Sequence, residues 1–234
     1  MQSIKITLTV LILLIYQDLL QAQEISKSNF SIGITAGIGK YFQSDLKEIN
    51  SDVANQLSFE TTLIDNFPPT FFWGVHLAYR KSPRFYFGPD YQFHTTGSRL
   101  GYKDYSGSYS YDQILSCNSI ALKIENFLFK TGVTSFGLSM TSGVNLSNWK
   151  IIEKVTVGKQ IESSLTKLFA VRPFIYPSIK LKYSIIEFLS ISMAAGYSID
   201  LGGKYRIKYT DKSTFDLTAK WTGPRVELNI DYSF

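Results

Sequence analysis

The sequence predicts an all-β protein: an eight-stranded antiparallel up-and-down β-barrel that crosses a membrane, with long extracellular loops and short periplasmic turns. Three observations predict it. Apolar and polar residues alternate with a period of two in eight segments, aromatic residues make up 15% of the chain, and tight connections alternate with long ones. Successive side chains of a strand point to opposite faces, so each alternating segment has one apolar and one polar face.

Composition excludes several other classes of protein. A length of 234 residues suits one domain, and the high aromatic content argues against a disordered chain. The net charge of +5 comes from 24 basic and 19 acidic residues scattered along the chain, which is no nucleic-acid footprint. A single cysteine, Cys117, and two histidines provide no disulfide scaffold and little material for a metal centre. We therefore expect no nucleic-acid partner, cofactor or metal site.

Residues 1–22 have the pattern of a secretory signal peptide. Lys5 is the positive charge of its first part, an apolar run covers residues 6–16, and Ala22 precedes Gln23 as a small residue at a plausible cleavage point. A membrane anchor is the alternative, but it needs about 18 apolar residues, and Asp18 ends this run early. We expect a cleaved signal peptide at residues 1–22 and a barrel domain at residues 23–234.

The eight strands follow in chain order. In residues 30–39 every even position is apolar and every odd position is Gly, Ser or Thr. Six segments repeat the alternation, and the last one alternates apolar side chains with Arg225, Glu227 and Asp231. The expected strands are residues 30–39, 71–80, 85–94, 119–125, 136–145, 171–184, 189–200 and 225–234.

The apolar faces are predicted to point outward. A soluble β-sandwich also alternates, but its apolar faces lie inside. Here the polar faces are rich in Gly, Ser, Ala and Thr with isolated charges of both signs, which suits a cramped interior. The apolar faces end in aromatic residues, as in the two interfacial girdles of membrane barrels. The two girdles are predicted at Phe30, Tyr79, Phe85, Phe136, Tyr183, Phe188 and Phe234, and at Tyr41, Phe71, Trp73, Trp149 and Trp221.

The connections agree with this orientation. Residues 81–84 and 184–187 read as tight turns, and the segment 126–134 as a longer one that fits the scheme least well. The connections predicted on the opposite side are long: residues 41–69, 97–113, 146–170 and 202–216. Short periplasmic turns and long extracellular loops are typical of outer-membrane barrels.

Some of the long connections carry patterns of their own. Residues 97–113 are predicted to form a hairpin turning at residues 106–108, and residues 205–221 a second hairpin turning at 211–213. The apolar phase slips between Trp221 and Val226, and Gly223-Pro224 at the slip predicts a β-bulge. After Ser44, a candidate N-cap, apolar residues at helical spacing leave two alternatives for this link, a short helix or an irregular loop.

The chain resembles the small outer-membrane β-barrel proteins of Bacteroidetes, the group that includes the PorT-like barrels. The resemblance rests on the leader ending near Ala22-Gln23, the Gly-alternating first strand and the terminal segment Val-Glu-Leu-Asn-Ile-Asp-Tyr-Ser-Phe. It implies a bacterial outer-membrane location. It also implies that Ile230, Tyr232 and Phe234 form the signal that the barrel assembly machinery reads during insertion. It implies no catalytic residue.

The polar faces would place many charges inside the barrel. An eight-stranded barrel is just wide enough for side chains to fill it, and a buried ion must be paired. We expect a salt-bridged plug, with a narrow ion path or gate as the alternative. The predicted lumen charge network is Asp90, Lys123, Glu125, Arg172, Lys180, Asp200, Arg225, Glu227 and Asp231, and His76, His94, Lys182 and Lys220 share its phase.

Two functions compete on this evidence. The first is a structural or interaction protein, or an accessory subunit of an outer-membrane complex, that binds a protein or glycan partner through its extracellular loops while contacting outer-membrane lipid and lipopolysaccharide. Tyr and Arg commonly anchor interfaces. The predicted surface is Tyr102, Tyr105, Tyr109, Tyr111, Tyr205, Arg206 and Tyr209. The second is a lipid-modifying acyl hydrolase or transferase using His76 or His94, but no nucleophile stands in a recognisable motif. We expect no enzyme.

Overall fold

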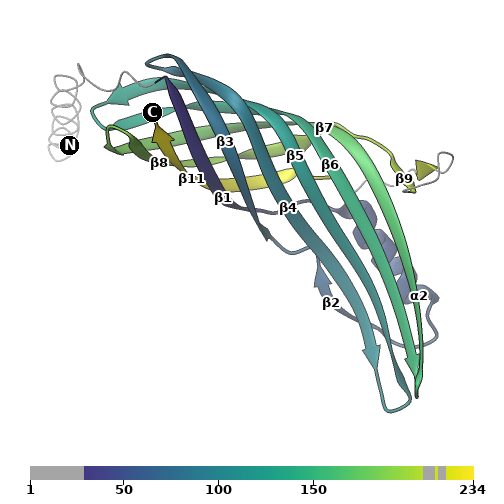
Figure 1. The fold of residues 1–234 in the computed structure, drawn as a ribbon. Coiled ribbons are helices and arrows are strands. Elements are labelled where there is room, and N and C mark those ends of the chain that lie inside the picture. The colour runs from purple at the N-terminus through teal and green to yellow at the C-terminus, as the bar shows by residue number, and fades with distance from the viewer. Residues whose placement is uncertain (1–28, 208–213, 216–219) are drawn as a thin grey trace, which may run out of the picture.

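The computed structural model describes residues 29–207, 214–215 and 220–234, whose regular elements are strands and one helix. The predicted signal peptide at residues 1–22 lies outside the described residues. Eight strands form the ring of the barrel (Figure 1). They are β1 (Phe30–Gly39), β3 (Thr70–Ser82), β4 (Phe85–Lys103), β5 (Gly107–Thr131), β6 (Thr134–Val157), β7 (Gln160–Ile186), β8 (Leu189–Asp200) and β11 (Gly223–Ser233).

The first and last strands close the ring. Ile34 of β1 pairs with Ile230 of β11 on one side and with Val75 of β3 on the other, and every contact is antiparallel. β11 continues to β8, and β8 pairs with β7. Because the ring is closed, the backbone N–H and C=O groups of each strand can pair with neighbouring strands of the ring, as a sheet surrounded by hydrocarbon requires. The predicted eight-stranded antiparallel barrel is confirmed.

The alternation of the sequence becomes an alternation of outside and inside. Ile34 is 59% exposed on the outer surface, whereas the adjacent Thr35 is buried in the lumen. On β11, Leu228 is 48% exposed and Glu227 only 1%. The barrel therefore has an apolar exterior and a polar interior, as predicted, and this is the inverse of a soluble β-sandwich.

One end of the barrel, here called the turn end, carries three short turns and the C-terminus (Figure 1). Two residues separate the last paired positions of β3 and β4, of β5 and β6, and of β7 and β8. The long turn predicted at 126–134 is wrong. A register shift between Phe127 and Phe129 leaves Leu128 as an extra residue, so the alternation breaks while the strand continues. Gly132 then turns the chain with φ at 55°.

At the opposite end, β4 to β7 continue beyond the ring as a curved sheet (Figure 1). We call this sheet the extension: residues 96–103, 107–115, 149–157 and 160–168, with the helix and strand packed on it. The predicted long connections 97–113 and 146–170 are thus hairpins in which the strands of the ring continue without a break up to the turn. The first turns at residues 104–106, two residues before the predicted position, because Lys103 already pairs with Ser108.

The link between β1 and β3 supplies the rest of the extension. It forms α2 (Ser44–Gln56) and β2 (Thr62–Asn66), and β2 pairs with β4. The helical alternative is confirmed. Ser44 is not the N-cap but the first helical residue, and Gln43 occupies the capping position without a side-chain hydrogen bond. Leu46 and Asn50 are the buried residues of α2. Among the described residues, no helix is long and apolar enough to cross a membrane.

The link between β8 and β11 contains a short hairpin of β9 (Tyr205–Ile207) and β10 (Thr214–Phe215). The predicted turn at 211–213 lies outside the described residues. The predicted bulge at Gly223 is wrong, because β11 pairs with β8 from Gly223 to Tyr232 without a register shift. The slip of the apolar phase in the sequence arises because the apolar residue Trp221 points into the barrel on the same phase as Arg225, whereas Val226 points outward. Lys220, predicted to point inward, is exposed.

Candidate functional site

The lumen of the barrel holds a dense set of charged side chains. All nine predicted members of the charge network are buried, with at most 7% of the residue exposed. Lys182, with 12% of its side chain exposed, joins them. With it, five cationic groups face five carboxylates, so the formal charges balance. The members are Lys123, Arg172, Lys180, Lys182 and Arg225, and Asp90, Glu125, Asp200, Glu227 and Asp231.

The centre of the network is a chain of alternating charges. Lys123 donates to Glu227 over 3.1 Å and lies 3.8 Å from Glu125. Glu125 in turn accepts a hydrogen bond from Lys180. The groups come from β5, β7 and β11, so the chain crosses the lumen from wall to wall. An unpaired buried ion would cost several kcal/mol, and each partner here removes that penalty for its neighbour.

Arg225 lies between two aromatic rings. Its guanidinium carbon is 4.5 Å from the centroid of Phe72 and 4.4 Å from that of Tyr176. It donates to Gln92, and Gln92 donates to Asp90 over 3.1 Å. Sequence reasoning missed Gln92 and Tyr176 as parts of the network, although both lie on the inward phase of their strands. A neutral amide and a stacked ring are invisible to a search for opposite charges.

A second ion pair lies nearer the extension. Arg172 donates to Asp200 over 3.0 Å, and both side chains are fully buried. Asp200 also accepts the backbone N–H groups of Gly202 and Trp221. One carboxylate thus neutralises a guanidinium and fixes both ends of the link between β8 and β11.

The two histidines occupy separate positions in the lumen. His76 Nε2 lies 2.6 Å from Asp231 Oδ1, and its Nδ1 lies 3.3 Å from the Thr35 hydroxyl. The His76–Asp231 contact passes over Gly33 of β1, where a Cβ would collide with both side chains. His94 Nδ1 instead lies 2.8 Å from the Tyr41 hydroxyl. Each histidine is packed and partnered, and the two do not form one site.

An apolar plug closes the lumen on the side of the extension. Trp221 and Tyr41 pack edge to face at 4.9 Å, and the Trp221 indole N–H donates to Ser147 over 3.0 Å. The side chains of the plug are Tyr41, Leu46, Phe67, Leu115, Cys117, Trp149, Leu168, Ala170, Tyr205 and Trp221. The girdle predicted for Tyr41, Trp149 and Trp221 is therefore wrong, because these three rings fill the mouth of the barrel. Phe71 and Trp73 do face outward, 73% and 53% exposed.

The tyrosines predicted as a loop surface are distributed over different environments. Tyr109 and Tyr111 are buried in a second apolar cluster with Leu100, under α2, and Tyr102 packs against that cluster. Burial and the Glu153 carboxylate raise the pKa of Tyr109. Among the five of them that the structure describes, Tyr105 alone is fully exposed. The predicted exposed surface is thus corrected for Tyr109 and Tyr111, because α2 covers the face of the sheet that carries them.

The remaining residues of the predicted loop surface also lie in different environments. Tyr205 is completely buried in the plug, and its hydroxyl lies 2.6 Å from that of Ser147, so it too is corrected. Arg206 is exposed. Tyr209 lies outside the described residues. The sequence located an aromatic-rich region correctly, but packing uses most of its rings.

The three residues of the predicted assembly signal share one face. Ile230, Tyr232 and Phe234 are 39%, 49% and 62% exposed on the outside of the barrel. The Phe234 ring lies 6.4 Å from that of Tyr232 and 6.5 Å from that of Phe30, which brings the two ends of the described barrel together. This cluster belongs to the aromatic rim of the turn end.

The two edges of the extension differ. β2 covers the edge of β4, with Thr62 to Asn66 paired to residues 98–101. On the other edge, residues 160–167 of β7 pair with β6 alone among the described strands, and β9 pairs only with Leu168 and Phe169. All eight residues of this open edge are exposed, including Ile161 at 63% and Leu165 at 55%. Beside it on β6, Val157 is 61% exposed and lines a groove with Phe59 and Tyr102.

The comparisons with known proteins concern the fold. No protein-family model and no curated protein matches the chain. Among solved structures, the attachment invasion locus protein Ail of Yersinia pestis is similar at 13% identity and a TM-score of 0.41, covering 89% of this chain and 100% of that one. The N-terminal β-barrel domain of Pseudomonas aeruginosa OprF matches at 12% identity and 0.34, covering 89% and 100%. The outer membrane protease OmpT of Escherichia coli matches at 10% and 0.35, covering 92% and 99%.

Proposed function

We infer that the protein is an integral outer-membrane β-barrel that binds a protein partner by strand addition to the open edge of its extension. The barrel anchors the chain in lipid, its turn end faces the periplasm, and the extension stands outside the cell. The apolar exterior, the aromatic rims and the sealed, charge-balanced lumen support the anchor role. The resemblance of the sequence to the small outer-membrane barrels of Bacteroidetes, PorT-like barrels included, agrees with this location.

The open edge of β7 carries the proposal. An unpaired strand edge presents a row of backbone donors and acceptors, and proteins usually cover such edges. Here β2 covers the edge at β4, while residues 160–167 are exposed and, among the described strands, pair with β6 alone. An extended segment of a partner can pair with them and place alternate side chains on the two faces. Ile161 and Leu165 offer apolar contacts on one of these faces.

No catalytic step belongs to this proposal. His76 and His94 act in it as packed lumen residues, and the plug separates both from the extension. Lipid and lipopolysaccharide are the surroundings of the barrel, and the barrel assembly machinery is a partner during insertion only. The protein acts as an anchor that presents one binding edge, by itself or as an accessory subunit of a larger complex.

Proline substitution tests the edge directly. Along an edge strand, successive backbone N–H groups point alternately to the neighbouring strand and to solvent. Of the two variants Ser163→Pro and Ser164→Pro, one therefore removes a solvent-facing donor and leaves the hydrogen bonds to β6 intact. When that variant is purified from detergent-solubilised outer membranes, we expect the amount of co-purified partner to be at least about tenfold lower than with the wild-type protein. Hydrogen exchange of β6 identifies which of the two leaves the extension folded.

The control is Tyr105→Ala, which changes a fully exposed residue on the β4–β5 hairpin, outside the edge strand. It should retain the partner at the wild-type level. A photo-cross-linker at position 163 should capture the same partner, and one at position 105 should not. If the folded proline variant retains the partner in full, binding does not use the β7 edge and the proposal fails.

A further inference from the structure

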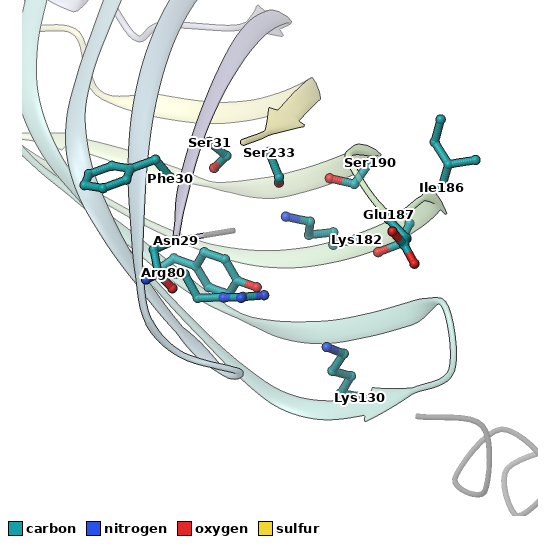
Figure 2. Close-up of a pocket in the computed structure, with 12 residues that line it drawn as sticks. Asn29, Phe30, Ser31, Arg80, Lys130, Lys182, Ile186, Glu187, Ser190 and Ser233 are labelled. Carbon is teal, nitrogen blue, oxygen red and sulfur yellow. The ribbon is translucent and has the colours of Figure 1, made fainter. Parts of the chain in front are cut away.

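The turn end of the barrel contains a small cavity with an unusual balance of charge. Arg80 of β3, Lys130 of β5 and Lys182 of β7 enter it from three different strands (Figure 2). Glu187 in the β7–β8 turn is the one carboxylate among the lining residues that the structure describes. The cavity therefore combines three cations with a single exposed anion. Lys182 also belongs to the lumen network, whose charges balance when it is counted there, so Arg80 and Lys130 are the cations that the cavity adds.

Tyr86 brings two of these cations together. The Lys182 ammonium lies 5.0 Å from the centroid of its ring, and its hydroxyl takes part in a hydrogen bond with Arg80. Lys182 also lies 4.0 Å from Asp231, but that carboxylate already holds His76 at 2.6 Å. The neutralisation of Lys182 from inside the barrel is therefore incomplete.

Lys130 has no such neighbour. Among the described residues, no carboxylate lies within 4.0 Å of its ammonium group. It lies next to the β5–β6 turn, outside the apolar band of the barrel, and half-buried. Burial, together with the charges of Arg80 and Lys182, lowers the pKa of Lys130. Like charges held this close repel one another, and an anion between them would relieve that repulsion.

Hydroxyl groups complete the lining. Ser31 and Ser190 are buried at the cavity wall, and Ser233 lies beside them (Figure 2). Guanidinium, ammonium and hydroxyl groups are the donors that recognise phosphate oxygens. The cavity has a volume of about 40 Å³, a few times the ~10–15 Å³ that one water needs. It suits a small oxyanion and excludes a folded domain.

We propose that the turn-end cavity is a binding site for a phosphate group, held by Arg80, Lys130 and Lys182 with the serine hydroxyls as further donors. Two sources present this chemistry on the periplasmic side: the headgroup of an anionic phospholipid and free phosphate. The cavity lies at the rim, where Phe30 and Ile186 line it and are also 54% and 46% exposed toward the outside. A lipid headgroup can therefore reach it from the membrane. This site is separate from the β7 edge and does not depend on it.

Titration of the full barrel in a non-ionic detergent tests the site. Inorganic phosphate is added at constant ionic strength against chloride, and dihexanoyl-phosphatidylglycerol below its micellar concentration is added in a second series; binding is followed by calorimetry. We expect Lys130→Gln to weaken binding at least about tenfold. Tyr86→Phe should weaken it less, because it removes only the hydroxyl that positions Arg80.

Lys81→Gln and Arg84→Gln are the matched controls, since both remove an exposed cation from the adjacent β3–β4 turn outside the cavity. Heat-modifiable migration on a detergent gel verifies that each variant is folded. Phosphate binding that depends on Lys130 but not on Lys81 supports the site with a soluble ligand, and binding of the lipid alone with the same dependence supports it with a headgroup ligand. Equal losses in Lys130→Gln and Lys81→Gln, or no binding of either probe, would overturn the proposal.

Discussion

The barrel and the extension share β4 to β7, and on β4 to β6 the two faces exchange character between the two halves. Along β5, the inner face changes from Lys123 in the lumen to Leu115 in the plug and Tyr111 under α2. The outer face changes in the opposite sense. In the barrel the outer face of β5 carries Ile120, which is 53% exposed. In the extension it carries Asp112, which forms an ion pair with Arg99 over 2.6 Å.

This exchange shows which solvent each half meets. In the barrel, hydrocarbon covers the outside, so apolar side chains face out and charges must pair inside. In the extension, water covers the outside, and the sheet needs an apolar layer between itself and α2. The plug lies where the exchange occurs. The barrel half is thus held together by ion pairs in its lumen, and the extension by ordinary hydrophobic packing.

The largest expected effect comes from breaking the lumen network. Lys123→Met removes the cation that pairs with Glu227 and Glu125 and leaves two buried carboxylates short of a partner. We expect a loss of roughly 3–5 kcal/mol in the free energy of unfolding, the usual cost of removing one member of a buried pair. Denaturant titration in detergent, followed by heat-modifiable gel migration, measures it.

The double variant Lys123→Met/Glu227→Gln should recover part of that loss, because it removes a charge from each side of the pair. Lys150→Met, an exposed cation on β6, should change stability by at most about 0.5 kcal/mol. If Lys123→Met were as mild as Lys150→Met, the lumen charges would be hydrated independently, and the contrast between the two halves would fail.

A smaller and local effect is expected from the extension. Leu46→Ala removes the only fully buried apolar side chain of α2, which packs in the plug. Leu-to-Ala changes in a packed core cost about 2–5 kcal/mol. We expect α2 to become sensitive to protease while the barrel keeps its heat-modifiable migration. Glu48→Ala on the exposed side of α2 serves as the control and should leave α2 protected. Simultaneous loss of the barrel would show that the halves unfold together.

The same contrast explains what the sequence could predict. Residues 30–39 and 225–234 alternate cleanly because lipid on one side and a polar lumen on the other impose a period of two. The helix at residues 44–56 was recoverable because Leu46, Ile49 and Val53 recur at helical spacing. The alternation of apolar and polar residues predicts less where both faces of a sheet meet the same solvent, or where an aromatic residue can lie on either face.

Trp149 illustrates the limit. Taken as an apolar residue near a rim, it suggests an interfacial girdle, but it shares the phase of Asn145 and Ser147, which face the lumen. The position of Trp149 in the alternation of its strand, and not its residue type, predicts that its side chain lies in the plug. The open edge of β7 and the cavity at the turn end had no local signal, because each depends on which strands are neighbours. Arg80, Lys130 and Lys182 are brought together by the closed ring alone.

The smallest effect concerns a single carboxyl group at the tip of the extension. Asp104 accepts hydrogen bonds from the hydroxyls of Ser106 and Tyr102 and from the N–H groups of Ser106 and Gly107. These bonds favour the ionised form and lower the pKa of Asp104 to about 2. Because the folded pKa lies below the unfolded value of about 3.9, the turn is stabilised above that pH, and the stabilisation disappears as the pH falls through about 2.

A titration of the side-chain carboxyl carbon by NMR measures this pKa directly. Tyr102→Phe removes one donor and should raise the pKa of Asp104 toward the unfolded value. A value near 4 in the wild-type chain would mean that the hairpin tip is open in solution. The extension would then end in a loose loop, and the ordered sheet that presents the β7 edge would be shorter than described.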